Sequence, residues 1–341
     1  MRRFVGFEKG INLGGWFSQC DHTQKRYDTF IVDSDFAELS TWGLDHIRIP
    51  VDYNLVETKD GTYIEEGFAR LEKAINLCRR YKLNMVLDLH KTAGFSFDQG
   101  EAETGFFSDE KLQERFYRLW EEFARRFGKY SDTVAFELLN EITEKSFSSV
   151  WNSIAGKCIK RIRAICPDVY ILVGGYWNNS IDALEDLEPP ADDKIVYNFH
   201  CYEPLLFTHQ GAYWVREMPR HFRMNFPVSV ESYQKNAKAL ELHSTPLVNS
   251  LPGPMVDGQL FDALFAKAVA VAEERNALLY CGEYGVINLA EVKDTLEWYK
   301  AINAAFVKYN IGRAAWSYKE MDYGLSDEHA RPIIEELKKY L

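Results

Sequence analysis

The chain has 341 residues, of which 46% are hydrophobic and 27% are charged, and these fractions are typical of a globular protein with a large apolar core. The formal net charge is −11, without a lysine- or arginine-rich run and without an apolar run of membrane-spanning length, so we expect neither a nucleic-acid partner nor a membrane partner. The 6 cysteines show no CxxC or zinc-type spacing, which indicates free thiols.

Short apolar segments alternate with longer amphipathic segments along the chain. The predicted strands are, in order, residues 6–12, 46–50, 84–90, 134–140, 170–174, 195–200, 278–283 and 313–316. Predicted helices between them include residues 63–81, 109–127, 148–165, 260–275 and 292–309. Eight strand-then-helix units in a chain of this length favour an α/β fold of the (β/α)8 barrel type, the TIM barrel. An open Rossmann-type sheet is the alternative, but no GxGxxG follows an early strand.

The connection after the sixth predicted strand is longer than the others. Residues 204–258 separate that strand from the next predicted helix, and they contain several aromatic and basic residues. We expect them to form a helical inserted subdomain over the mouth of the barrel. Residues 1–341 would then form a single catalytic barrel domain.

Polar residues gather at the ends of the predicted strands, where a barrel of this type places its chemistry. They are His46 and Arg48 on one face of the second strand, and His90, Asn140, Glu141, His200, Tyr202, Glu283 and Trp316 at the ends of later strands. One such residue would be explained as a buried ion pair or a structural histidine. A convergence from six strands indicates a functional site, because unpaired buried charge is costly.

Glu141 and Glu283 are the two carboxylic acids of this set. Hydrolysis of a glycosidic bond uses two carboxyl groups, one protonated to assist the leaving group and one ionised to attack or to activate water. A shared pocket separates their two pKa values through like-charge repulsion and unequal hydrogen bonding. We therefore predict a glycosidase site in which Arg48 and Tyr202 orient Glu283, and Asn140 binds a sugar hydroxyl.

The same positions carry a resemblance to a known family. They lie in His-Ile-Arg48-Ile-Pro, Asp-Leu-His90, Leu-Leu-Asn140-Glu141, Asn-Phe-His200-Cys-Tyr202, Gly-Glu283-Tyr-Gly and Ala-Ala-Trp316-Ser-Tyr. With this ordered set the chain resembles glycoside hydrolase family five, the cellulase family, over almost its whole length. The opening Gly-Ile-Asn12-Leu-Gly-Gly-Trp and the long insertion are most similar to the compact clostridial endoglucanases of the endoglucanase C type.

The resemblance implies a retaining endo-β-1,4-glucanase that hydrolyses cellulose-like or mixed-linkage β-glucans by double displacement, with no metal and no organic cofactor. It assigns acid/base catalysis to Glu141, the nucleophile to Glu283, a sugar platform to Trp316, and supporting or substrate-binding roles to Asn12, Arg48, His90, Asn140, His200 and Tyr202. Trp177 and Trp214 are candidates for stacking against sugars in other subsites. His90 is followed by Lys91 rather than by the second histidine frequent in the family, which changes the sugar contacts expected there.

Three alternatives remain open. A family-five enzyme of another specificity, for β-mannan, xyloglucan or β-1,3-glucan, would share the catalytic residues. A noncatalytic carbohydrate-binding barrel would need neither Glu141 nor Glu283. A metal-dependent hydrolase could use His46, His90 and His200, although no HxH or HExxH spacing supports it.

The sequence carries weaker expectations about the state of the protein. We expect a monomer that acts on a β-glucan or an oligosaccharide. The N-terminus does not read as a signal peptide, so we expect a cytoplasmic enzyme, or an extracellular one if an export signal is missing from the sequence.

Overall fold

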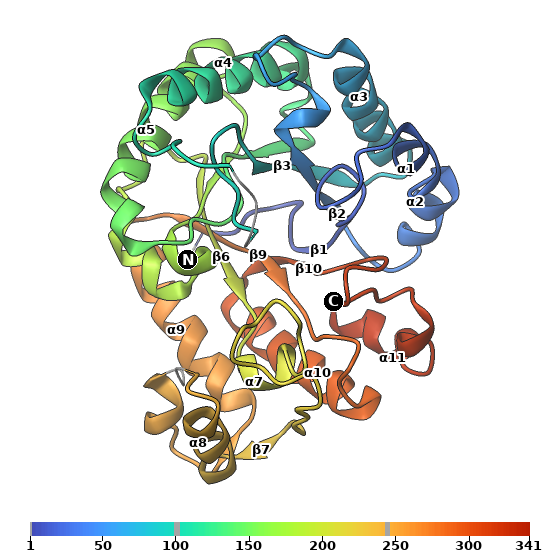
Figure 1. Cartoon of the computed structure of the whole chain (residues 1–341), viewed down its shortest axis with the longest axis vertical. Helices are drawn as coiled ribbons and strands as arrows, with labels where there is room; N and C mark the ends of the chain where they lie inside the picture. The colour runs from blue at the N-terminus through green and yellow to red at the C-terminus, as the bar shows by residue number, and fades with distance from the viewer. Residues whose placement is uncertain (1, 99–102, 243–245) are drawn as a thin grey trace.

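Eight parallel strands close into a barrel in the computed structural model, in the order β1-β10-β9-β6-β5-β4-β3-β2. The structure describes residues 2–98, 103–242 and 246–341. The barrel strands are β1 (Lys9–Asn12), β2 (His46–Asp52), β3 (Asn84–Lys91), β4 (Val134–Glu137), β5 (Ile171–Val173), β6 (Ile195–Cys201), β9 (Leu278–Tyr284) and β10 (Gly312–Ala315). Figure 1 shows these strands at the centre with helices around them. The (β/α)8 barrel predicted from the sequence is confirmed.

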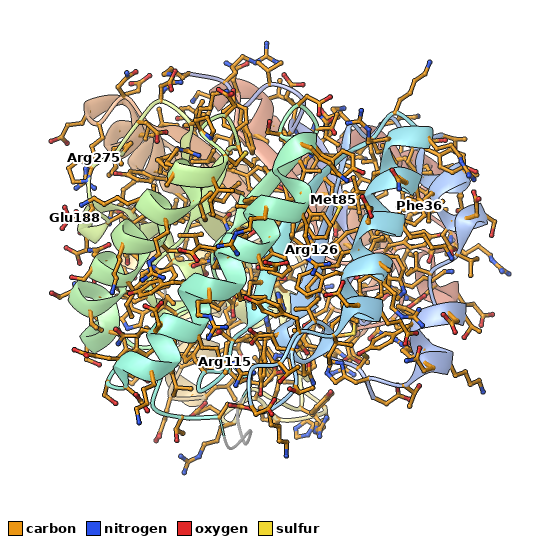
Figure 2. The ribbon with its side chains drawn as sticks, turned by 90° about the horizontal axis from the view of Figure 1, so that it is seen from above. Phe36, Met85, Arg115, Arg126, Glu188 and Arg275 are labelled. Atoms are coloured by element: carbon orange, nitrogen blue, oxygen red, sulfur yellow. The ribbon has the colours of Figure 1, made fainter. Side chains whose placement is uncertain are left out.

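Most of the longer helices cover the outer face of the barrel, and α7 and α8 belong to the insertion after β6. The helices are α1 (Gln24–Thr29), α2 (Asp33–Leu39), α3 (Glu65–Arg80), α4 (Glu110–Phe127), α5 (Ser148–Ile165), α6 (Tyr176–Asn179), α7 (Leu205–Thr208), α8 (Val230–Ala239), α9 (Gly258–Glu274), α10 (Val292–Tyr309) and α11 (Ile334–Leu337). Neighbouring helices are also joined at their surface, where Arg126 of α4 donates to both oxygens of Glu65 of α3 at 2.7 Å (Figure 2). Within the described ranges, no helix has the length and apolarity needed to cross a membrane.

Two strand boundaries differ from the prediction by three residues, and the others by two residues or fewer. The rings of Phe4 and Phe7 stack at 4.3 Å and pack under the barrel, so β1 begins at Lys9 rather than at residue 6. Strand β4 ends at Glu137, although the backbone N–H of Asn140 still donates to a neighbouring strand. The chain therefore continues along the barrel wall beyond the regular strand.

The barrel interior consists of an apolar lower layer and a polar upper layer. The lower layer is formed by Val86, Ala135, Leu172, Val196, Leu278, Tyr280 and Ala314. The next inward-facing positions along the strands carry Asn12, Arg48, Asp88, Glu137 and Asn198, all of them buried. The polar and charged side chains of the barrel interior therefore lie directly above the apolar layer.

A β-bulge in β9 sets the direction of Glu283. Tyr280 faces the interior, so strict alternation would place Gly282 inside the barrel and Glu283 outside. The register between β6 and β9 shifts between Phe199 and His200, and His200 pairs with Glu283. A Cβ at Gly282 would lie 3.0 Å from His200 Nε2, which favours glycine there. The bulge turns Glu283 into the interior.

The insertion after β6 contains helices and also a small sheet, which was not predicted. Helices α7 and α8 are accompanied by β7 (Val228–Ser229) and β8 (Met255–Val256), which pair antiparallel. Figure 1 shows α8 and β7 at one end of the molecule, beside α9. The first part of the insertion contacts loops of the barrel, because Thr208 O accepts from Ile287 N at 3.0 Å and from Tyr323 Oη at 3.2 Å. Residues 243–245 of the predicted insertion lie outside the described part.

Two helical glycines provide a test of helix packing against the barrel. A Cβ at Gly67 of α3 would lie 1.9 Å from the backbone oxygen of Leu55, whereas a Cβ at Gly156 of α5 would meet nothing within 4 Å. We expect Gly67→Ala to lower the free energy of unfolding by about 1–3 kcal/mol through overpacking. Gly156→Ala, the matched control, should raise it by up to about 1 kcal/mol through helix propensity. Urea unfolding measures both, and a Gly67→Ala variant as stable as the parent would contradict this packing.

Candidate active site

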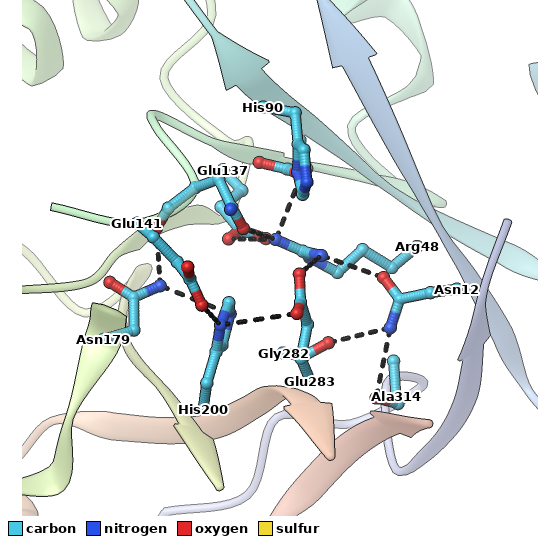
Figure 3. A network of polar contacts seen from close by, with 12 residues as sticks. Asn12, Arg48, His90, Glu137, Glu141, Asn179, His200, Gly282, Glu283 and Ala314 are labelled. Carbon is cyan, nitrogen blue, oxygen red and sulfur yellow. Dashed lines mark hydrogen bonds and ion pairs between the residues drawn. The ribbon is translucent and has the colours of Figure 1, made fainter. Parts of the chain in front are cut away.

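Arg48 of β2 is fully buried at the centre of the polar layer. It donates to both oxygens of Glu137 at 2.7 and 2.8 Å and to Glu283 Oε1 at 2.8 Å, and its Nη2 lies 3.0 Å from Asp88 Oδ2 (Figure 3). Burial alone would lower the pKa of Arg48, but Asp88, Glu137 and Glu283 raise it well above its ordinary value. The guanidinium is therefore charged and offsets part of the cost of burying three carboxyl groups.

Two asparagines hold Arg48 from the other sides. Asn12 Oδ1 accepts from Nη1 at 2.9 Å, and Asn140 Oδ1 accepts from Nη2 at 2.8 Å. Asn12 Nδ2 donates to the backbone oxygens of Gly282 at 3.0 Å and Ala314 at 3.2 Å. Asn12 thus fixes Arg48 to the barrel wall.

Glu283 receives two hydrogen bonds, as the sequence predicted. Arg48 donates to Oε1, and the Tyr202 hydroxyl donates to Oε2 at 2.9 Å. Burial and the nearby charge of Glu283 raise the pKa of Tyr202 well above its ordinary value, so this phenol keeps its proton. Two donors, one of them cationic, stabilise a negative charge on Glu283.

Glu141 occupies a different environment, just beyond the end of β4. Its Oε2 accepts from Asn178 Nδ2 at 2.7 Å, and its Oε1 lies 2.8 Å from His200 Nδ1. Burial raises the pKa of Glu141, and the hydrogen bond from Asn178 offsets only part of this effect. The protonated form of Glu141 is therefore favoured relative to that of an exposed glutamate.

The ring of His200 lies between the two glutamates. Its Nε2 is 3.3 Å from Asn179 Nδ2, which also donates to Asn140 O at 2.6 Å. Because this amide nitrogen can only donate, Nε2 accepts, and Nδ1 carries the proton that faces Glu141. Burial lowers the pKa of His200 to about 4, so the ring is neutral above that pH.

The two glutamates lie close together. One oxygen of Glu141, one ring nitrogen of His200 and one oxygen of Glu283 all lie within 4.8 Å of one another. The carboxyl groups of retaining glycosidases are about 5–5.5 Å apart, and those of inverting enzymes about 6.5–9.5 Å, which leaves room for a water molecule. A separation of at most 4.8 Å between one oxygen of each glutamate is compatible with the retaining spacing.

The histidine metal centre considered as an alternative is not assembled. Within the described residues, the group able to hold a metal ion is the one formed by Glu141, His200 and Glu283, so it includes only one of the three histidines. His46 has both ring nitrogens engaged, by Asp45 at 2.6 Å and by Tyr280 at 2.7 Å.

His90 and Trp316 form a side of the site. Their rings are parallel within 2°, with centroids 5.8 Å apart, and Phe97 packs edge-on against His90 at 4.8 Å. His90 Nδ1 lies 2.5 Å from Asp88 Oδ2. Burial raises the pKa of Asp88 to about 7 and lowers that of His90. Asp88 thus fixes the orientation of the His90 ring.

The two predicted stacking tryptophans differ in exposure. Trp177 follows β5 and is 52% exposed, with its ring perpendicular to that of Tyr176 at 5.0 Å. Trp214 lies in the insertion, is half-buried, and contacts the rings of His209 at 6.0 Å and Tyr323 at 6.3 Å. Their role in sugar stacking remains a prediction.

Lys91, the departure from the family pattern, is buried in an ion pair. Its Nζ lies 2.8 Å from Asp98 Oδ2 and 3.9 Å from Asp52 Oδ2. Asp98 belongs to the loop after β3, of which residues 99–102 lie outside the described part. Lys91 therefore ties this loop to the end of β2.

The sequence analysis missed several polar residues that hold the site. Four of them are buried and Asn178 is exposed: Asp88, Glu137, Asn178, Asn179 and Asn198. Asp88 and Asn198 lie two positions before His90 and His200, so the period-two rule applied to each strand would have found them. Glu137 accepts from Asn198 Nδ2 at 2.8 Å as well as from Arg48. Asn178 and Asn179 gave no such signal, because they lie in a turn with φ of 56° and 57° after β5.

Comparisons with known proteins show the family of the chain. The sequence model described as Cellulase (glycosyl hydrolase family 5) matches residues 8–322. The chain is 48% identical over 313 residues to cellodextrinase A of Ruminococcus flavefaciens, covering 92% of this chain and 86% of that protein. It is 35% identical over 341 residues to endoglucanase C of Acetivibrio thermocellus, covering 99% and 98%.

A solved structure shows the same likeness in three dimensions. The Clostridial cellulose synthase subunit Z from Clostridioides difficile matches with a TM-score of 0.75 and 25% identity, covering 97% of this chain and 99% of that chain. The family predicted from the strand-end motifs is thereby confirmed. The chain belongs to glycoside hydrolase family 5, the cellulase family, and is a glycoside hydrolase.

Proposed function

We propose that this enzyme is a retaining endo-β-1,4-glucanase that hydrolyses cellulose-like or mixed-linkage β-glucans, with Glu283 as nucleophile and Glu141 as acid/base. The observation that carries the proposal is the pair of glutamates, whose oxygens lie within 4.8 Å of each other but which have different partners. Glu283 faces a cation and a phenol, whereas Glu141 faces a neutral imidazole and an amide.

The two environments support a double displacement. In the first step Glu283 attacks the anomeric carbon while Glu141 gives its proton to the departing glycosidic oxygen, and a glycosyl-enzyme ester forms. In the second step Glu141 takes a proton from water, the water oxygen attacks the anomeric carbon, and Glu283 leaves as a carboxylate. The N–H of His200 stabilises Glu141 whenever it is ionised, since the ring is neutral and donates from Nδ1.

The substrate class rests on relatives and on the aromatic side chains near the glutamates. A cellodextrinase and an endoglucanase are among the relatives, which supports a β-glucan or its oligosaccharides. Trp316 would support the sugar at the cleaved bond, next to His90, and Trp177 and Trp214 would stack on sugars farther away. The amide nitrogen of Asn140 would donate to a hydroxyl of the central sugar.

Reducing-sugar release from a set of polysaccharides tests the specificity. We expect activity on barley β-glucan and carboxymethylcellulose, with little on mannan, xyloglucan or laminarin, and none from Glu283→Gln on any of them. Activity confined to mannan, xyloglucan or laminarin would replace the substrate and keep the mechanism. No activity on any glycan from a folded protein would favour a noncatalytic carbohydrate-binding barrel.

Removal of the nucleophile should be rescued chemically. Glu283→Ala should lower kcat by about 10⁴-fold or more, and azide should restore turnover of an activated aryl glycoside by giving a product of inverted configuration. Product analysis by NMR measures the configuration. Glu291→Ala, at an exposed carboxylate before α10, is the matched control and should keep full activity. A folded Glu283→Ala variant that azide does not rescue would remove Glu283 from this role.

Removal of the acid should depend on the leaving group. Glu141→Ala should lower kcat/KM by about 10²–10⁴-fold on natural glucans, which need protonation of the leaving oxygen, and far less on dinitrophenyl glycosides, which do not. Steady-state kinetics on both substrates measures the difference, with Glu144→Ala as the exposed control. Equal losses on both substrates would count against Glu141 as the acid.

The pH dependence should follow the hydrogen bond from Asn178. General acid catalysis requires protonated Glu141, so kcat/KM should fall as the pH rises through its pKa. Asn178 holds that pKa lower than burial alone would set it, and Asn178→Gly, which also suits the left-handed backbone there, should move the alkaline limb to higher pH. Ser180→Ala, in the same turn, should leave the limb in place. An alkaline limb that moves to lower pH in Asn178→Gly would contradict the assignment.

A further inference from the structure

A second cluster of reactive side chains lies near the carboxyl ends of β1, β2 and β3. Cys20 Sγ is 3.7 Å from His22 Nδ1, and His22 Nε2 is 3.2 Å from Asp52 Oδ2. This order of thiol, imidazole and carboxylate is the one that activates cysteine nucleophiles in unrelated proteins. The glycosidase chemistry uses none of these three residues.

Asp52 is the buried, charged end of this cluster. Its Oδ1 accepts from Ser18 Oγ at 2.6 Å, its Oδ2 accepts from Gln19 N at 3.2 Å, and Lys91 Nζ lies 3.9 Å from Oδ2. Burial by itself would raise the pKa of Asp52, but the bond from His22 and the charge of Lys91 hold it below its ordinary value. A fixed negative charge therefore faces the imidazole.

His22 is held as an imidazolium beside the thiol. Burial lowers its pKa, but the interactions with Asp52 and Cys20 outweigh burial and raise it to about 9. The other groups near the ring are the neutral phenol of Tyr27, whose oxygen lies 2.9 Å from Nδ1, and the carboxylate of Asp21. A cation next to Sγ stabilises the negative charge that a reacting thiol must carry.

Cys20 differs from the other cysteines in its accessibility. All six are free, but Cys78, Cys158, Cys166, Cys201 and Cys281 are buried, whereas Cys20 is half-buried. Cys20 is therefore the least buried of the six cysteines.

The cluster is connected to the substrate side of the barrel by short polar contacts. Gln19 Nε2 donates to Asp98 Oδ1 at 3.2 Å, and Asp98 pairs with Lys91 at 2.8 Å. Phe97, next to Asp98, packs on His90. Cys20 is therefore the chain neighbour of the residue that contacts this loop.

We propose that Cys20 is a modification site that low-molecular-weight disulfides such as glutathione disulfide convert to a mixed disulfide, and that the adduct weakens substrate binding. The thiol of Cys20 loses its proton to solvent, and the thiolate attacks one sulfur of the disulfide. The S–S bond breaks, and the second sulfur leaves as a thiolate and takes up a proton. Cys20 is oxidised, half of the disulfide is reduced, and excess thiol reverses the exchange. Only the effect on substrate binding rests on the proposed function.

Alkylation of the full-length protein by iodoacetamide tests the site independently of catalysis. We expect one adduct per chain by intact mass, at Cys20 by peptide mapping, and none in Cys20→Ser. At pH 6.5 the labelling rate of His22→Gln should be about tenfold or more below that of the parent, because the variant lacks the imidazolium. First labelling at another cysteine, or equal rates in a folded His22→Gln variant, would overturn the proposal.

Two further measurements keep the test decisive if His22→Gln does not fold. The parent enzyme should react with iodoacetamide at pH 6.5 faster than free glutathione does, and slower reaction would overturn the proposal. Treatment with glutathione disulfide should raise KM at least several-fold with little change in kcat, and dithiothreitol should reverse the change. Cys20→Ser should be unaffected by glutathione disulfide, and a KM increase in that variant would place the reactive thiol elsewhere.

Discussion

The buried charge of Arg48 is the constraint on which the site depends. A guanidinium enclosed in a barrel is tolerable only if its N–H groups are paired and its charge is balanced. Glu137 accepts from two of these donors and so fixes the orientation of the guanidinium that also donates to Glu283. Asn12 then links Arg48 to the barrel wall at β9 and β10. The position of Glu283 is thus set by the interior of the barrel rather than by a surface loop, which is the preorganisation that catalysis requires.

The same network gives Glu141 and Glu283 different electrostatic surroundings. Glu283 has direct contact with Arg48, whereas the direct partners of Glu141 are the neutral His200 and an asparagine. Burial therefore stabilises the protonated form of Glu141, while the charge of Glu283 is balanced. Because His200 is kept neutral by its own burial, it can lie between both glutamates without fixing both as carboxylates.

The sequence was informative wherever period-two alternation held. Alternation placed Arg48 inside the barrel, and the family motifs supplied both glutamates. Alternation does not explain why Glu283 faces the interior, because this direction depends on the bulge at Gly282. A bulge depends on the pairing between two strands rather than on either strand alone. Alternation also could not reveal Glu137, since apolar residues surround this glutamate in sequence and its partner Arg48 lies 89 positions away. The hydrogen bond that Asn178 donates to Glu141 from the turn after β5 was equally hidden.

The role of Lys91, which stands where the family frequently has a histidine, can be understood only from its partners elsewhere in the chain. In sequence it is a cation where the family frequently has a histidine, which suggests a changed sugar contact. In the structure its Nζ pairs with Asp98 and lies 3.9 Å from Asp52. Asp98 follows Phe97, whose ring packs on His90. Asp52 also pairs with His22. A single buried carboxylate therefore couples the wall beside His90 to the loop after β1, and a change of charge on either side alters the balance on the other.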